Sequence, residues 1–161
     1  MVAIFYFLFA CTTCHAQTIS GTKNNAVSLE IGKSGLIYNL NFDHRFPGKD
    51  FGFRFGVGSN FAKYLQAFTG GAGGYYLHGR DINFLELGVD LNYLSVDEVS
   101  DDQKGFSIIY PNYPVKTFYA SANVGYRRYG KKTLFRIGVS PGVIKNEFLP
   151  GGYISLGLTF L

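Results

Sequence analysis

The chain of 161 residues has no tryptophan, only two cysteines and few charged residues. Both cysteines, Cys11 and Cys14, lie in the first fourteen residues, so no disulfide framework holds the rest of the chain. Charged residues make up 16% of the sequence, below the roughly 25% of ordinary soluble domains. Beyond residue 16, the longest stretch without a charged, amide or histidine residue is 148–161. It is shorter than the ~20 residues of a membrane-spanning helix, so any crossing of a bilayer must use strands.

Glycine and aromatic residues are abundant instead, with 21 glycines, 16 phenylalanines and 12 tyrosines. This composition favours many strands joined by turns over helices. The length is that of a single domain with one core. The net charge of +4 is compatible with an acidic partner, either nucleic acid or an anionic membrane surface.

The clearest strand is FLELGVDLNY, Phe84 to Tyr93, whose residues alternate between two faces. Leucine, valine and tyrosine side chains occupy one face, whereas Glu86, Asp90 and Asn92 occupy the other. A helix would scatter these carboxylates over its surface. The pattern therefore predicts a strand with one apolar and one charged face.

The same alternation recurs along the chain and predicts eight strands separated by turn residues. Their expected ranges are 26–32, 36–46, 51–58, 65–77, 84–93, 115–129, 134–143 and 153–161. The glycine-rich segment 65–77 gives no clear facing. A turn is expected over 78–81, and the polar segment 97–114 is expected to be the longest loop.

The connections alternate between tight, basic turns and longer loops, which is typical of an up-and-down barrel in an outer membrane. The predicted fold is therefore an all-β, eight-stranded antiparallel up-and-down transmembrane β-barrel. A soluble lipocalin-like lipid carrier in the periplasm is the alternative, because such a barrel alternates too, with its apolar face inward. Small residues and balanced charges on the polar face favour a crowded lumen, and hence lipid outside.

The strands FLELGVDLNYL, LFRIGVSP and the closing GGYISLGLTFL carry a resemblance to a known family. The chain resembles the small eight-stranded outer-membrane β-barrel proteins of bacteria, of the OmpA-barrel and OmpX-like kind, over residues 26–161. This resemblance implies an outer-membrane location, contact with outer-membrane lipids, and insertion by the barrel assembly machinery. A terminal strand that ends in an aromatic residue resembles the signal read by that machinery; here Phe160 is penultimate.

Charged and amide side chains on the polar faces are expected to meet inside the barrel as a structural network of ion pairs and hydrogen bonds. The predicted members are Glu30, Arg54, Glu86, Asp90, Asn92, Asn123, Arg127 and Arg136.

The apolar faces are expected to meet lipid, with aromatic residues at the two membrane interfaces. The predicted lipid-facing residues are Leu85, Leu87, Val89, Leu91, Ile137, Val139, Ile154, Leu156 and Leu158. The predicted interface aromatics are Phe51, Phe84, Tyr93, Tyr126, Phe135 and Phe160.

The sequence offers little for catalysis, cofactors or metals. His44 follows Asp43 near a strand end and His78 lies in a predicted turn, and no serine stands at a recognisable spacing from either. We therefore predict no enzyme activity and no cofactor, with a lipid-modifying outer-membrane enzyme as the alternative. A structural, adhesion or interaction role in the cell envelope is expected, with an extracellular partner through the 97–114 loop.

The segment 126–132 mixes basic and aromatic residues, as single-strand nucleic-acid binders do. Strand alternation sends Arg127 and Arg128 to opposite faces and leaves Lys131 and Lys132 in a turn. No nucleic-acid partner is therefore expected, and contact with lipid headgroups or phosphate fits the segment better.

Residues 1–16 read as a secretory signal peptide, with an apolar run over 2–10 and small residues before Gln17. Acylation at Cys11 is the competing interpretation of the same segment. The expected division is thus a signal peptide over 1–16, a short N-terminal segment over 17–25 and the barrel over 26–161.

Overall fold

The structure, a computed structural model, describes residues 23–33, 38–61, 65–98, 115–144 and 147–161. These residues form antiparallel strands. The strands are β1 (Asn25–Gly32), β2 (Tyr38–Arg45), β3 (Phe51–Ser59), β4 (Leu65–Arg80), β5 (Asn83–Glu98), β6 (Val115–Tyr129), β7 (Thr133–Val139), β8 (Gly142–Ile144), β9 (Glu147–Leu149) and β10 (Gly152–Phe160). The predicted signal peptide, and with it Cys11 and Cys14, lies outside the described residues.

The sheet closes on itself, because β1 pairs with both β2 and β10, and β5 pairs with both β4 and β6. Strands β7 and β8 both pair with β6 and together form one interrupted wall strand. The interruption lies at Ser140 and Pro141, where proline lacks the N–H that a continuous ladder needs. A second break at Pro150 and Gly151 separates β9 from β10. The predicted eight-stranded antiparallel barrel is therefore confirmed.

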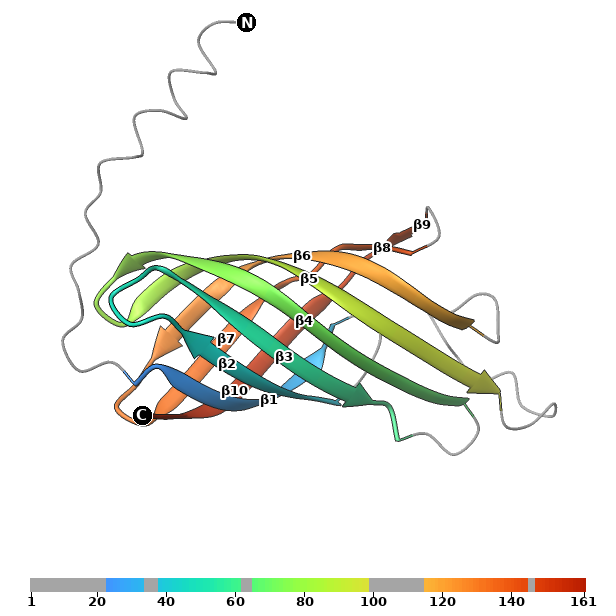
Figure 1. The fold of residues 1–161 in the computed structure, drawn as a ribbon, viewed down its shortest axis with the longest axis horizontal. Coiled ribbons are helices and arrows are strands. Elements are labelled where there is room, and N and C mark those ends of the chain that lie inside the picture. The colour runs from blue at the N-terminus through green and yellow to red at the C-terminus, as the bar shows by residue number, and fades with distance from the viewer. Residues whose placement is uncertain (1–22, 34–37, 62–64, 99–114, 145–146) are drawn as a thin grey trace, which may run out of the picture.

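The barrel is elongated, and its two ends differ (Figure 1). The tight turns after β2, β4 and β6 lie at the same end as the C-terminus and the start of β1. We call this the tight-turn end and the other the loop end. Within the described part of the chain, no helix has the length and apolar character needed to cross a membrane.

Two strands are longer than the sequence predicted. Strand β4 does not end at Leu77 but continues through Arg80, which pairs with Asn83 of β5. The expected four-residue turn over 78–81 is thus wrong, and Asp81 and Ile82 alone turn the chain. Asp81 accommodates this tight turn with a φ of 58°. Strand β5 likewise runs on to Glu98, beyond Tyr93.

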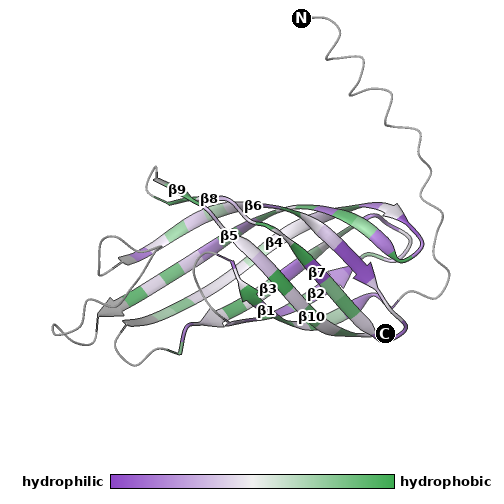
Figure 2. Ribbon diagram, turned by 180° about the vertical axis from the view of Figure 1, so that it is seen from behind, coloured by the Kyte–Doolittle hydropathy of each residue, from purple (hydrophilic) through white to green (hydrophobic). Residues whose placement is uncertain are grey.

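Buried and exposed residues alternate along the long strands. Hydrophilic and hydrophobic residues also alternate along the ribbons in Figure 2. The facing of β4, which the sequence left open, follows from burial: Thr69, Tyr75 and Leu77 point inward, whereas Phe68 and Tyr76 point outward. The barrel interior is therefore filled from all sides by side chains of alternate residues.

Apolar side chains close the interior towards both ends. Ala26, Tyr75, Leu77, Phe84, Tyr129 and Leu134 form one cluster at the tight-turn end. A second cluster towards the loop end contains Ala67, Leu94, Val96, Tyr119 and Leu149. The charged residues described below lie between them.

The prediction that Phe84 is an interface aromatic is wrong. Its side chain is 4% exposed and packs inside the barrel, with its ring edge-to-face on Tyr129. The reason is strand parity, because Phe84 shares its face with Glu86 and lies opposite to Leu85.

Candidate functional site

The centre of the barrel interior is the carboxylate of Glu86, which accepts hydrogen bonds from three arginines. Arg136 binds it through Nε and Nη2, at 3.0 and 2.9 Å. Arg127 Nε donates at 2.6 Å and Arg54 Nη2 at 2.5 Å. These arginines stand on β7, β6 and β3, so a single carboxylate ties together three parts of the wall.

Two further carboxylates balance the three guanidinium charges. Asp43 Oδ1 accepts from Arg54 Nε at 3.1 Å and from Arg127 Nη2 at 2.8 Å. Glu30 Oε2 accepts from Arg136 Nη1 at 3.0 Å. All six side chains are at most 3% exposed. The cluster is electrically neutral, which is the condition under which buried charges are tolerated.

Aromatic rings cover the faces of the arginines that carboxylates do not reach. Arg127 lies 4.1 Å from the ring centroid of Tyr75, and its Nη1 donates to the Tyr129 hydroxyl at 2.9 Å. Arg136 lies 4.8 Å from the ring of Tyr153. Cation–π contacts of this kind stabilise a guanidinium that has lost its water.

A second ion pair lies closer to the loop end, between Lys33 and Asp90. The backbone turns inward there, because Gly32 and Lys33 have φ values of 100° and 56°. Lys33 is consequently only 9% exposed, although it follows the last residue of β1. Asp90 also accepts from Asn123 Nδ2 at 2.7 Å, so it is held from two directions.

A small polar cavity lies between this pair and the central cluster, and Glu30, Asn41, Arg54 and Asp90 contribute to its wall. Its volume of about 20 Å³ has room for roughly one water molecule. Glu30 Oε1 and Asn41 Nδ2, an acceptor and a donor, are buried there without a partner among the described residues. A cavity of this size does not hold an organic solute.

The structure buries all eight residues that the sequence predicted for the interior, and it sorts them into groups. Glu30, Arg54, Glu86, Arg127 and Arg136 meet in the central cluster. Asp90 and Asn123 join the Lys33 pair, whereas Asn92 donates to Ser121 at 3.3 Å.

Asp43, Tyr153, Tyr75 and Lys33 are among the interior residues of this region that were not predicted from the sequence. Asp43 shares strand parity with Asn39 and Asn41, and Tyr153 shares it with Ser155, so alternation alone could have placed both inside. Tyr75 lies in the glycine-rich strand that alternation could not orient. No sequence signal places Lys33, because its direction depends on the φ values of the turn.

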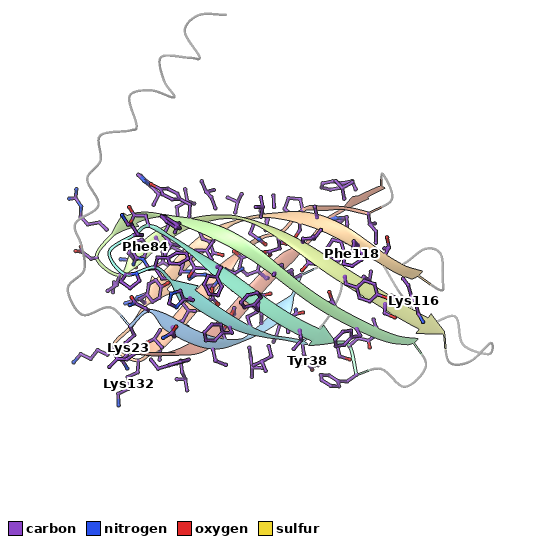
Figure 3. All side chains as sticks on the ribbon, in the orientation of Figure 1. Lys23, Tyr38, Phe84, Lys116, Phe118 and Lys132 are labelled. Carbon is purple, nitrogen blue, oxygen red and sulfur yellow. The ribbon has the colours of Figure 1, made fainter. Side chains whose placement is uncertain are left out.

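The outer surface carries the predicted apolar residues. Leu85, Leu87, Val89, Leu91, Ile137, Val139, Ile154, Leu156 and Leu158 are all between 41% and 67% exposed. Phe51, Tyr93, Tyr126, Phe135 and Phe160 also point outward. On β6, the outward residues between Tyr126 and Phe118 are Ala120, Ala122 and Val124, all uncharged. Lys23 and Lys132 lie at the tight-turn end, and Lys116 lies towards the loop end (Figure 3).

Neither described histidine lies inside the barrel. His44 Nδ1 is 2.8 Å from Asn25 Oδ1, and its ring packs on Phe46 and Phe53 at the outer surface. His78 is exposed on β4. Over the described ranges, no three histidine, cysteine, aspartate or glutamate side chains gather in a way that could hold a metal ion.

These features define a class of protein: a closed eight-stranded antiparallel barrel with an apolar outer wall and a filled, charged interior. No family model and no curated protein matches the sequence. Among solved structures, the chain is similar to the N-terminal β-barrel domain of Pseudomonas aeruginosa OprF, with a TM-score of 0.69 and 10% identity, over 88% of this chain and 100% of that one.

A second similar structure is the Yersinia pestis outer membrane protein Ail in a phospholipid bilayer nanodisc. Its TM-score is 0.50 at 10% identity, over 86% of this chain and 99% of that one. The resemblance to small eight-stranded outer-membrane barrels is therefore confirmed at the level of the fold.

Proposed function

We propose that this protein is a non-enzymatic, non-conducting barrel of the bacterial outer membrane, with a structural or interaction role in the cell envelope. The observation that carries the proposal is the inverted distribution of polarity. Three arginines surround Glu86 inside the barrel, whereas Val89 and Leu156 are about two-thirds exposed outside. A soluble barrel would have the opposite arrangement, with polar side chains on its outer surface and apolar side chains inside.

In hydrocarbon, backbone N–H and C=O groups must form hydrogen bonds within the protein. A closed barrel allows this, because every wall strand has a neighbour on both sides. The likeness to outer-membrane barrels supports the same location. In this orientation the tight turns face the periplasm and the longer connections face outward. The barrel assembly machinery inserts the chain, and a partner meets it through the 97–114 loop, of which residues 99–114 lie outside the described part.

The two alternatives fit the geometry less well. A lipocalin-like carrier needs an apolar cavity for its ligand, whereas the cavity here is polar and water-sized. A lipid-modifying enzyme needs a nucleophile and a base within reach of each other, and His44 instead contacts the amide of Asn25.

Membrane fractionation tests the location directly. We expect the protein in the outer-membrane fraction, with an electrophoretic mobility that changes on boiling, because a closed barrel resists detergent until heated. Recovery in the soluble periplasm would contradict the proposal.

Conductance in a planar bilayer tests the filled interior. Reconstituted protein should show no steady pore current, since the charged cluster and the two apolar clusters fill the interior. A large-barrel porin reconstituted in the same way is the positive control. A stable open channel would show that the interior opens in the membrane.

A further inference from the structure

The tight-turn end of the barrel carries an excess of exposed positive charge. Lys49, Arg80, Arg128, Lys131 and Lys132 are exposed there and have no ion-pair partner among the described residues. The acids of the same end are Asp81 and Asp50, and Asp50 is already paired with Arg45 at 3.2 Å. The excess attracts anions to this end of the barrel.

Two of these cations stand on the outer wall in a row with an amide. Arg80 of β4 pairs in register with Asn83 of β5, and Asn83 pairs with Arg128 of β6. All three point outward and are exposed. Because neighbouring strands are ~4.8 Å apart, the Cα atoms of the two arginines are separated by roughly 10 Å across the wall. Both guanidinium groups can reach one phosphate group across this distance.

The amide between the arginines is oriented by a neighbouring tyrosine. The Tyr126 hydroxyl donates to Asn83 Oδ1 at 2.5 Å, and this leaves the Nδ2 group of Asn83 to donate outward. The Tyr126 ring in turn packs against Phe135, with centroids 6.4 Å apart. A donor is thus held between two cations.

The wall next to this row becomes apolar with distance from the arginines. The next residues in register are His78, Leu85 and Tyr126, and the level after them contains Tyr76, Leu87 and Val124. Tyrosines favour the headgroup level of a bilayer, and the aliphatic residues suit acyl chains. A free phosphate ion would use the arginines and the amide but not the apolar wall below.

We propose that Arg80, Asn83 and Arg128 form a binding site for the phosphate headgroup of an anionic phospholipid, in the leaflet at the tight-turn end. This inference rests on the proposed membrane location. It adds a lipid class and three binding residues to it.

The test measures lipid selectivity of the refolded protein in vesicles that contain phosphatidylcholine and a minor fraction of phosphatidylglycerol. Spin-labelled versions of each lipid report the fraction immobilised at the protein surface. We expect a roughly fivefold preference for phosphatidylglycerol, reduced to less than about twofold in Arg80→Gln/Arg128→Gln. A preference that the double variant retains would overturn the site.

The matched control is Lys49→Gln/Lys132→Gln, which removes the same charge from turns at the same end. This control should retain most of the preference, and an equal loss in both variants would overturn the site in favour of diffuse attraction. Inorganic phosphate, compared with chloride at equal ionic strength, should not displace the lipid, and displacement would identify a free-anion site instead.

The two proposals fail in different ways. Vesicle-bound protein that shows the heat-dependent mobility of a folded barrel, but no lipid preference, would overturn this site alone. Protein that does not fold into these vesicles would overturn the membrane location together with the site.

Discussion

Glu86 on β5 and Arg127 on β6 form a diagonal ion pair, with Nε 2.6 Å from Oε2. They are not register partners, because Glu86 lies opposite Gly125 and Arg127 lies opposite Phe84. Gly125 itself has no room for a side chain, because a Cβ there would run into the Tyr153 hydroxyl and the Ile137 carbonyl oxygen. Both charged side chains are fully buried.

Replacing Glu86 by glutamine should destabilise the barrel strongly. The change keeps the shape but leaves three buried arginines with one carboxylate fewer, at a cost of roughly 3 to 5 kcal/mol. Urea unfolding in detergent micelles, followed by electrophoretic mobility, measures the free energy. The control Asp50→Asn breaks the more exposed pair with Arg45 and should cost at most about 1 kcal/mol. Equal effects of the two changes would contradict a central role for Glu86.

An arginine at Val89 tests the environment of the outer wall. Val89 lies midway along the outward residues of β5 and is 67% exposed. In lipid, Val89→Arg should cost about 2 to 4 kcal/mol, whereas Thr133→Arg at the tight-turn end should cost about 0 to 1 kcal/mol. Refolding equilibria in phospholipid vesicles measure both. If Val89→Arg were as well tolerated as Thr133→Arg, this wall would be facing water.

Two adjacent glycines of β4 should respond differently to alanine. A Cβ at Gly73 would run into the Val89 carbonyl oxygen and the Asp90 carboxylate. We expect Gly73→Ala to cost about 1 to 3 kcal/mol through overpacking. A Cβ at Gly74 points outward, with its nearest atom, the Gly52 oxygen, 3.8 Å away, so Gly74→Ala should be neutral or slightly stabilising. Urea midpoints compare them, and the reverse order would mean that the facing of β4 is inverted.

A double-mutant cycle on Lys33 and Asp90 measures whether the turn after β1 is anchored inside the barrel. Because both partners are buried, Lys33→Met and Asp90→Asn should show a coupling energy of roughly 1 to 3 kcal/mol. Thermal or urea unfolding of the four proteins provides the values. Lys33→Met combined with the distant Asp50→Asn should be additive within about 0.5 kcal/mol. Additivity of the first pair as well would rule out an inward Lys33.

Strand count and most strand facings were within reach of the sequence, since each depends on neighbours along the chain. The alternation in Phe84 to Tyr93 correctly placed Glu86 and Asp90 on one face and Leu87 on the other. The end of β4 was out of reach, because His78 and Gly79 favour a turn locally but gain ladder partners on β5. The inward position of Phe84, in contrast, was within reach of the sequence, because Phe84 lies two residues before Glu86 and therefore on the same face of β5.

The sequence by itself determined that the chain forms two-faced strands, how many there are, and that one face collects arginines and carboxylates, because side-chain alternation is a local property of extended backbone. Only the tertiary structure decided which charges meet. Arg136 and Glu30 are 106 residues apart and come within 3.0 Å because β10 pairs with both β1 and β7. Closure of the barrel sets that distance, and no pattern along a single strand contains it.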